Sequence, residues 1–221
     1  QWCVNYAISV NSASDHTIIR RNTITESGNG IYIIATTTAT NSNYLQVTSN
    51  TIHDLNQTGF YTTGVAASDG HAIGVQGGSN NLYQFNVITH LGGSCFTLYD
   101  FAAQVLQGNS ILSNWCEDVN DPSALGRREI GFEYGNINTG HVANDVANNV
   151  VSGNVFTNVG TTCIDTKSVQ PSVGRAWTHT HNTLIDCAIG LKFRYDTDGN
   201  TGFIYTNNIC QNCTVQTFHF Q

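Results

Sequence analysis

Few side chains of this protein can do acid–base chemistry, because only 10% of its 221 residues are charged and lysine and arginine together number eight. Two of these cations, Lys167 and Lys192, lie three residues after an apolar residue in successive repeats of one sequence pattern. Tyr99 and Glu133 hold the same place in two earlier repeats, and Arg194 extends the row. A catalytic base must lie within hydrogen-bond reach of the proton that it removes. We therefore predict one patch with Lys167, Lys192 and Arg194 as its catalytic candidates.

Polar residues on and beside this row are expected to contact a ligand. Side chains alternate between the two faces of a strand, so a residue three places after an inward one points outward. The predicted binding residues are Tyr99, Glu133, Asp165, Gln76 and Glu129. Glycines at positions 74, 131 and 190 would keep the centre of this face flat and let a flat ligand approach the backbone. The alternative is a surface ladder of ion pairs that offsets like-charge repulsion and binds nothing.

An internal repeat must hold these residues in register. It reads asparagine, any residue and an apolar residue, then a short turn and a second apolar strand. Its copies start at Asn22, Asn50, Asn86, Asn109, Asn154, Asn182 and Asn207. Neighbouring copies start 23 to 45 residues apart, which fits a coil of three short strands per turn with insertions in the longer turns. We expect the asparagines to form a hydrogen-bonded ladder at one corner of the coil.

The repeat predicts an all-β chain, a right-handed parallel β-helix of about seven to eight rungs that occupies residues 1–221 as a single domain. Inward apolar side chains would stack at ~4.8 Å from rung to rung. One expected stack is Ile24, Ile52, Ile88, Ile111, Phe156, Leu184 and Ile209. The other is Ile31, Ile73, Phe96, Ile130, Ile164, Ile189 and Val215.

Charge and hydropathy exclude two classes of partner. The net charge is −7 and no basic run exists, so the chain lacks the cations that neutralise nucleic-acid phosphates. No stretch approaches the ~20 apolar residues of a membrane helix. Hydrophobic residues still make up 40% of the sequence, which predicts a folded chain rather than a disordered one.

Cysteines and the start of the chain predict an extracellular protein. The chain begins at Gln1 and contains no methionine, so we expect a processed or excised part of a longer, secreted precursor. Of seven cysteines, Cys187 and Cys213 each lie two residues before an aligned apolar residue. Adjacent rungs would bring them close to disulfide distance, and buried free thiols are the alternative. Asn56 and Asn212 match the N-glycosylation pattern and are acceptors in a glycosylating host.

The asparagine repeat, the glycine corners and the charged column resemble the right-handed β-helices of the pectate-lyase-like superfamily. Nearly the whole chain shares this resemblance. Members of that superfamily include polysaccharide lyases, glycoside hydrolases, epimerases, tailspikes and adhesins. In its lyases a lysine or arginine abstracts the proton α to a uronate carboxylate, and cations, often Ca²⁺, neutralise that carboxylate. The resemblance implies this role for Lys167, Lys192 and Arg194, and it makes Ca²⁺ the candidate cofactor.

Two shorter motifs point to chemistry and have structural alternatives. Asp69-Gly70-His71 is similar to the Asp-Pro-His catalytic motif of alginate epimerases, with glycine in place of proline, which makes His71 a further catalytic candidate. An Asp-Gly turn ahead of a strand explains the same residues. The segment Asp196-Thr197-Asp198-Gly199-Asn200 is rich in oxygen ligands for calcium, and β-turns use the same residue types.

Two classes of function follow from these patterns. The first is an extracellular carbohydrate-active β-helix that acts on an acidic polysaccharide by lyase or epimerase chemistry, with a basic patch on an acidic protein as its substrate site. The second is a non-catalytic structural or adhesive β-helix. Its end rungs would join copies head to tail into a filament, because an open solenoid end is an unpaired edge.

Overall fold

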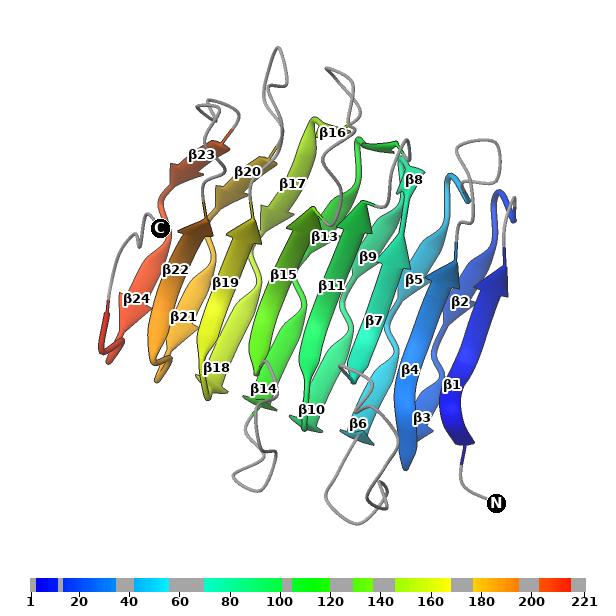
Figure 1. Cartoon of the computed structure of the whole chain (residues 1–221), viewed down its shortest axis with the longest axis horizontal. Coiled ribbons are helices and arrows are strands. Elements are labelled where there is room, and N and C mark those ends of the chain that lie inside the picture. The colour runs from blue at the N-terminus through cyan, green and yellow to red at the C-terminus, as the bar shows by residue number, and fades with distance from the viewer. Residues whose placement is uncertain are drawn as a thin grey trace.

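The chain winds into a right-handed parallel β-helix, as the computed structural model shows (Figure 1). The structure describes residues 3–11, 14–34, 42–55, 70–100, 105–119, 129–136, 146–167, 177–194 and 203–215. Within these ranges the side chains at 3–5, 100, 135–136, 167 and 193–194 are not described. The described residues form 24 strands and no helix. Every strand pair is parallel and joins one turn of the coil to the next, so the predicted fold class is confirmed.

Three sheets of seven strands run the length of the coil. Sheet A contains β1 (Cys3–Asn11), β4 (Ser27–Ile34), β7 (His71–Gln76), β11 (Ser94–Asp100), β15 (Ile130–Asn136), β19 (Thr162–Lys167) and β22 (Ile189–Arg194). Sheet B contains β2 (Ile18–Arg20), β5 (Gln46–Thr48), β9 (Leu82–Gln84), β13 (Ser110–Leu112), β17 (Asn149–Ser152), β20 (Trp177–Thr180) and β23 (Phe203–Thr206). Sheet C contains β3 (Thr23–Thr25), β6 (Thr51–Leu55), β10 (Val87–Leu91), β14 (Trp115–Val119), β18 (Val155–Val159), β21 (Thr183–Ile185) and β24 (Ile209–Gln211). A small sheet D joins β8 (Gly78–Ser79), β12 (Leu106–Gln107) and β16 (Val146–Ala147).

An asparagine ladder between sheets B and C fixes the register of the rungs. Its members are Asn22, Asn50, Asn86, Asn114, Asn154, Asn182 and Asn208. Each side-chain amide donates to the Oδ1 of the next member at 2.9–3.0 Å. The predicted members Asn109 and Asn207 are wrong. Asn109 belongs to a second ladder with Asn81 and Asn149 at the entrance to sheet B.

The corner before this ladder requires an unusual backbone. The residue that precedes each ladder asparagine has a positive φ of 53–66°, at Arg21, Ser49, Phe85, Ser113, Gly153, His181 and Asn207. This left-handed conformation costs most residues about 1–2 kcal/mol, whereas asparagine and glycine adopt it readily. Asn207 therefore lies at the left-handed position, and Asn208 is the residue that turns inward.

The core is a set of inward stacks, one per sheet. Sheet C stacks Ile24, Ile52, Ile88, Cys116, Phe156, Leu184 and Cys210. Sheet A stacks Ile31, Ile73, Phe96, Phe132, Ile164 and Leu191. Five predicted members were wrong. Ile111 lies in sheet B, Ile209 is 63% exposed, and Ile130 and Ile189 pair two positions before the predicted place. Val215 forms a bridge with Ile189, so it too is two positions from its predicted place.

Three disulfides cross-link the interior. They join Cys95 to Cys116, Cys163 to Cys187, and Cys210 to Cys213. The predicted bridge between Cys187 and Cys213 is therefore wrong, because each of these cysteines has a different partner. Disulfides form in oxidising compartments outside the cytosol, and three of them agree with the extracellular prediction. No helix in the described part of the chain is long and apolar enough to cross a membrane.

Candidate functional site

The outer face of sheet A carries a column of polar residues in exact strand register. Thr97 of β11 pairs with Glu133 of β15, Glu133 pairs with Asp165 of β19, and Asp165 pairs with Lys192 of β22. Neighbouring strands in a sheet lie about 4.7–4.9 Å apart. Two carboxylates therefore follow each other directly along the column, with a lysine beside the second one. We call these four residues the polar column.

The two carboxylates are unusually buried. Glu133 is 1% exposed and Asp165 is fully buried, whereas Lys192 is half-buried. Aspartate and glutamate are almost never fully buried unless they are paired, since losing water from a charge is costly. Both residues have interactions beyond the strand pairing described here. A buried, interacting pair of ionisable groups on a surface strand is the kind of arrangement that gathers at functional sites.

An aromatic row continues from the polar column toward the N-terminal end of sheet A. The rings of Tyr6 and Tyr32 stack at a centroid distance of 4.5 Å, and Tyr32 and His71 stack at 6.2 Å. Tyr99 meets His71 edge to face at 5.6 Å. A Cβ atom at Gly74 would lie 2.4 Å from ring carbons of Tyr32. Glycine at position 74 is therefore needed for this ring to lie against the sheet.

Hydrogen bonds tie the aromatic row to the polar column. His71 Nδ1 and Thr97 Oγ1 are 2.9 Å apart. Gln76 donates from Nε2 to the hydroxyl of Tyr32 at 2.8 Å. His71 also donates its main-chain N–H to Asn29 Oδ1 at 2.7 Å. The predicted residues His71, Gln76 and Tyr99 therefore lie in one connected group, although Tyr99 is not in the polar column.

The predicted single row of Tyr99, Glu133, Lys167 and Lys192 is wrong. Tyr99 pairs with Gln76 on one side and Gly135 on the other, and Lys167 pairs with Arg194. Tyr99, Gln76, Lys167 and Arg194 form one column three positions after the inward stack, whereas Glu133 and Lys192 lie two positions earlier than predicted, in the polar column. The misplacement comes from aligning Ile130 and Ile189 with Phe96, which shifted β15 and β22 by two residues. The main chains of Lys167 and Arg194 are described, and their side chains lie outside the described residues.

The remaining candidates are dispersed or fall outside the described residues. The main-chain carbonyl of Glu129 accepts from the N–H groups of Thr161 and Thr162 at 3.2 Å, so this residue helps to position β19. Asn212 is exposed, and its side-chain amide donates to Asp186 Oδ1 at 3.0 Å. Asn56, Asp69 and the segment 196–200 lie outside the described residues. Among those described, no group of three or more histidine, cysteine, aspartate or glutamate residues is arranged to hold a metal ion.

Sequence reasoning missed Thr97, Tyr32 and Tyr6 as site residues. An alignment anchored on Phe132 and Leu191 would have placed Thr97 in the same column as Glu133. The aromatic row had a weaker signal, because Tyr32 and His71 are three residues apart in register and their contact depends on the absence of a side chain at position 74.

The arrangement can support proton transfer. Two carboxyl groups in reach of one bound molecule can act as general acid and general base, and a lysine can serve as a base or hold an anion. Hydrolysis of a glycosidic bond uses such a carboxyl pair. Elimination from a uronate uses a base and a group that neutralises the substrate carboxylate.

Comparisons of the chain with models of protein families, with curated protein sequences and with solved structures gave no match. The proposal of a function therefore rests on the fold, on the polar column and on the aromatic row beside it.

Proposed function

We propose that this protein is an extracellular, carbohydrate-active β-helix of the pectate-lyase-like kind that acts on an acidic polysaccharide at the outer face of sheet A. The observation that carries the proposal is the polar column, in which Glu133, Asp165 and Lys192 follow one another on three paired strands. The aromatic row supports it by positioning the column, because its buried rings pack on one another and His71 Nδ1 lies 2.9 Å from Thr97 Oγ1. A chain of sugars lying along the coil axis would reach the column at Lys192, its half-buried member.

The polar column supplies each role that an elimination reaction needs. Lys192, which is half-buried, is the proposed base, and as a neutral amine it removes the proton α to the uronate carboxylate. The bond to the departing glycosidic oxygen then breaks, that oxygen takes up a proton from water, and a carbon–carbon double bond forms in the sugar that remains. Asp165 pairs with Lys192 across the strands and would stabilise the ammonium group that forms. His71, which is buried and 2.9 Å from Thr97 Oγ1, would help to hold the column in place.

Glu133 and Asp165 would repel an acidic polysaccharide unless a cation offset their charge. Both offer the hard oxygen ligands that Ca²⁺ prefers, so they are the residues that would hold such an ion. When bound, Ca²⁺ would neutralise the uronate carboxylate. The protein side chains would still perform the proton transfer.

Activity measurements with matched variants test the proposal. Pectate, alginate and glycosaminoglycans are incubated with the protein, and the ultraviolet absorbance of unsaturated uronate is followed. Lys192→Met and Asp165→Asn are expected to lower the rate by about 10²–10⁴-fold, the usual contribution of acid–base groups. Glu117→Gln on the outer face of sheet C is the control and should keep full activity. Lack of cleavage, epimerisation and binding of all these glycans by the wild-type protein would refute the proposal.

A non-catalytic structural or adhesive role is the second candidate. It is favoured by the strand order, because the terminal strands β1 of sheet A, β23 of sheet B and β24 of sheet C each have one neighbouring strand among the described elements. Unpaired sheet edges promote pairing with another chain. A head-to-tail contact makes a filament unless its rotation closes a ring. Sedimentation at increasing protein concentration separates the candidates, since a filament subunit would grow in mass and a soluble enzyme would not.

A further inference from the structure

Two cysteines from different disulfides occupy the same position on consecutive rungs. Ile185 pairs with Gln211 just before them, and Ile189 bridges Val215 just after them. Both flanks thus place Cys187 opposite Cys213 with no register shift between. The main chain agrees, because Thr214 donates its N–H to the carbonyl of Cys187 at 3.2 Å.

The spacing between these two cysteines suits a disulfide as well as the spacing between the bonded partners does. The bonded pairs have Cα–Cα distances of 5.9 Å for Cys163 and Cys187 and 6.0 Å for Cys210 and Cys213. Residues in register on neighbouring strands are about 4.8 Å apart. Disulfides form over Cα separations of about 4.4–6.8 Å. The Cα spacing of Cys187 and Cys213 therefore falls within the range that a disulfide can bridge.

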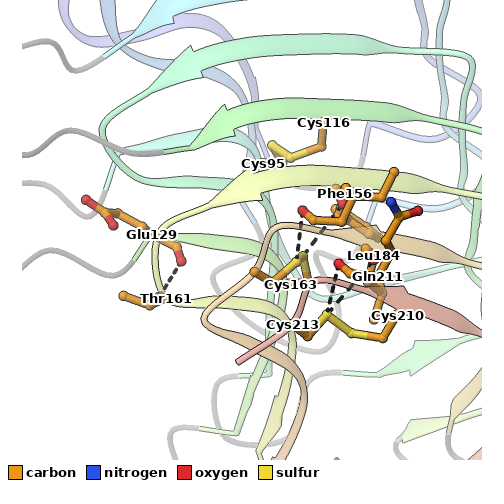
Figure 2. The surroundings of a disulfide bond; sticks show 12 residues. Cys95, Cys116, Glu129, Phe156, Thr161, Cys163, Leu184, Cys210, Gln211 and Cys213 are labelled. Carbon is orange, nitrogen blue, oxygen red and sulfur yellow. Dashed lines mark hydrogen bonds between the residues drawn. A yellow bond between two sulfur atoms is a disulfide. The ribbon is translucent and has the colours of Figure 1, made fainter. Parts of the chain in front are cut away.

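The sulfurs of Cys163, Cys210 and Cys213 lie close together (Figure 2), and Cys187 is bonded to Cys163. The Sγ atom of Cys163 is 3.7 Å from the carbonyl oxygen of Phe156, and that of Cys213 is 4.0 Å from the carbonyl oxygen of Leu184. Phe156 and Leu184 are paired neighbours in sheet C. The disulfides thus pack against successive steps of one inward stack.

We propose that the disulfides Cys210–Cys213 and Cys163–Cys187 can exchange. Reduction of the first, in the last described rung, would then lead to opening of the second. An external dithiol first reduces the bond between Cys210 and Cys213 and is itself oxidised to a disulfide. The thiolate of Cys213 then attacks the Sγ atom of Cys187. A bond between Cys187 and Cys213 forms, the bond between Cys187 and Cys163 breaks, and Cys163 leaves as a thiolate that takes up a proton. One dithiol is consumed and two protein thiols, Cys163 and Cys210, remain.

The direction of transfer follows from access and loop size. Cys210 is half-buried and Cys213 is 8% exposed, whereas Cys163 is fully buried. A reductant therefore reaches the last rung first. The outer disulfide closes a loop of sequence separation 3, compared with 24 for the inner one. A short loop restricts the unfolded chain less, so the outer bond is the less stabilising of the two.

The exchange changes which rungs of the coil are connected by a disulfide. The bond between Cys210 and Cys213 lies within the last rung and ties it to nothing else. A bond between Cys187 and Cys213 would fasten the last rung to the rung before it. The exchange therefore converts a reduction within the last described rung into a covalent link between that rung and the one before it.

A single substitution tests the proposal without any reductant. In Cys210→Ser the thiol of Cys213 is left next to the intact bond between Cys163 and Cys187. All variants also carry Cys3→Ser, because the side chain of Cys3 lies outside the described residues. The folded protein is held at mildly basic pH, quenched with acid and labelled with a maleimide in denaturant, and labelled peptides are identified by mass spectrometry. We expect the label at Cys163 to rise from background to a share comparable with that at Cys213.

The control is Cys116→Ser, which frees Cys95. The positions in register with Cys95 are Ala72 and Gly131, since Phe96 pairs with Ile73 and Phe132. No second sulfur is in reach there, so the label should stay on Cys95. Label found on Cys213 alone in Cys210→Ser would overturn the proposal.

Limited reduction of the wild-type disulfides gives a second readout if Cys210→Ser does not fold. One equivalent of dithiothreitol is added to folded protein carrying only Cys3→Ser, and cross-linked peptides are mapped after an acid quench. A peptide pair joined through Cys187 and Cys213 supports the proposal. Retention of the bond between Cys163 and Cys187 in all singly reduced protein would overturn it.

Discussion

A buried histidine should make the stability of this β-helix depend on pH. His179 of β20 lies in the inward stack of sheet B, between Val151 and Tyr205. Its ring stacks on that of Tyr205 at 4.8 Å and meets the edge of Phe132 at 5.6 Å. Neither ring nitrogen has a hydrogen-bond partner among the described residues. Burial favours the neutral ring and lowers the pKa of His179 from its ordinary value of 6.5 to about 3.

The size and sign of the effect follow from this pKa. Between pH 6.5 and pH 3 the unfolded chain binds a proton at His179 and the folded chain does not, so the stability falls as the pH falls. One pKa unit corresponds to about 1.36 kcal/mol. Lowering the pH from 8 to 5 should therefore remove about 2 kcal/mol of the free energy of unfolding through this residue alone. Above pH 7 the contribution is fully present and constant.

The assay compares urea unfolding of the wild type and of His179→Phe at pH 8 and pH 5. Phenylalanine keeps the stacking with Tyr205 and cannot titrate. The loss of unfolding free energy on acidification should be smaller in the variant by about 2 kcal/mol. Replacing the exposed His181 by asparagine is the control and should leave the wild-type dependence in place. Equal losses in the wild type and His179→Phe would refute the reasoning.

Three further predictions concern the elements that hold the coil together, and each is measured by urea unfolding. Asn114→Leu should cost about 3 kcal/mol, because Asn114 makes two hydrogen bonds to Asn86 at 2.9 Å and its loss leaves buried donors without acceptors. Phe132→Ala should cost about 3–5 kcal/mol, since this fully buried ring packs on Trp177 at 5.3 Å. Phe85→Asn should stabilise the protein by about 1 kcal/mol, because Phe85 is 56% exposed with φ of 57° and asparagine tolerates this conformation.

The repeat could be predicted from the sequence because the fold needs the same side chain at the same corner of every turn. A buried asparagine that bonds to its copies above and below cannot be replaced by other residue types without leaving polar groups unsatisfied. The sequence could not show which of several nearby asparagines occupies the ladder position. Asn109 and Asn114 both precede an apolar residue after one intervening position, and only pairing with the neighbouring turns assigns them to different corners. Asn207 and Asn208 are adjacent, and the left-handed corner suits the first of them.

The predicted column of the candidate site was wrong in strand register. The prediction of which strand face each side chain occupies was right. Side chains alternate with a period of two, so a shift by two residues preserves the apolar pattern and leaves every face unchanged. Ile130 and Phe132 therefore satisfy the sequence pattern equally well. The pairing of Phe132 with Phe96 decides between them and brings Glu133 next to Thr97 and Asp165. Variable turn lengths conceal this pairing, because the insertions remove the constant spacing that would have fixed it.

The disulfides show that two cysteines can be neighbours in the coil without being bonded to each other. The sequence placed Cys187 and Cys213 at the same position on neighbouring rungs, and the strand register agrees with that placement. The bonds are nevertheless made to Cys163 and Cys210, since an inward side chain at a corner can reach along its own rung, to the next sheet or to the next turn. A repeat fixes which main-chain positions are neighbours, and the direction of each Cβ–Sγ bond selects among them. Thiol–disulfide exchange can change which cysteines are bonded, because exchange requires only that a thiolate reach the sulfur of an existing bond.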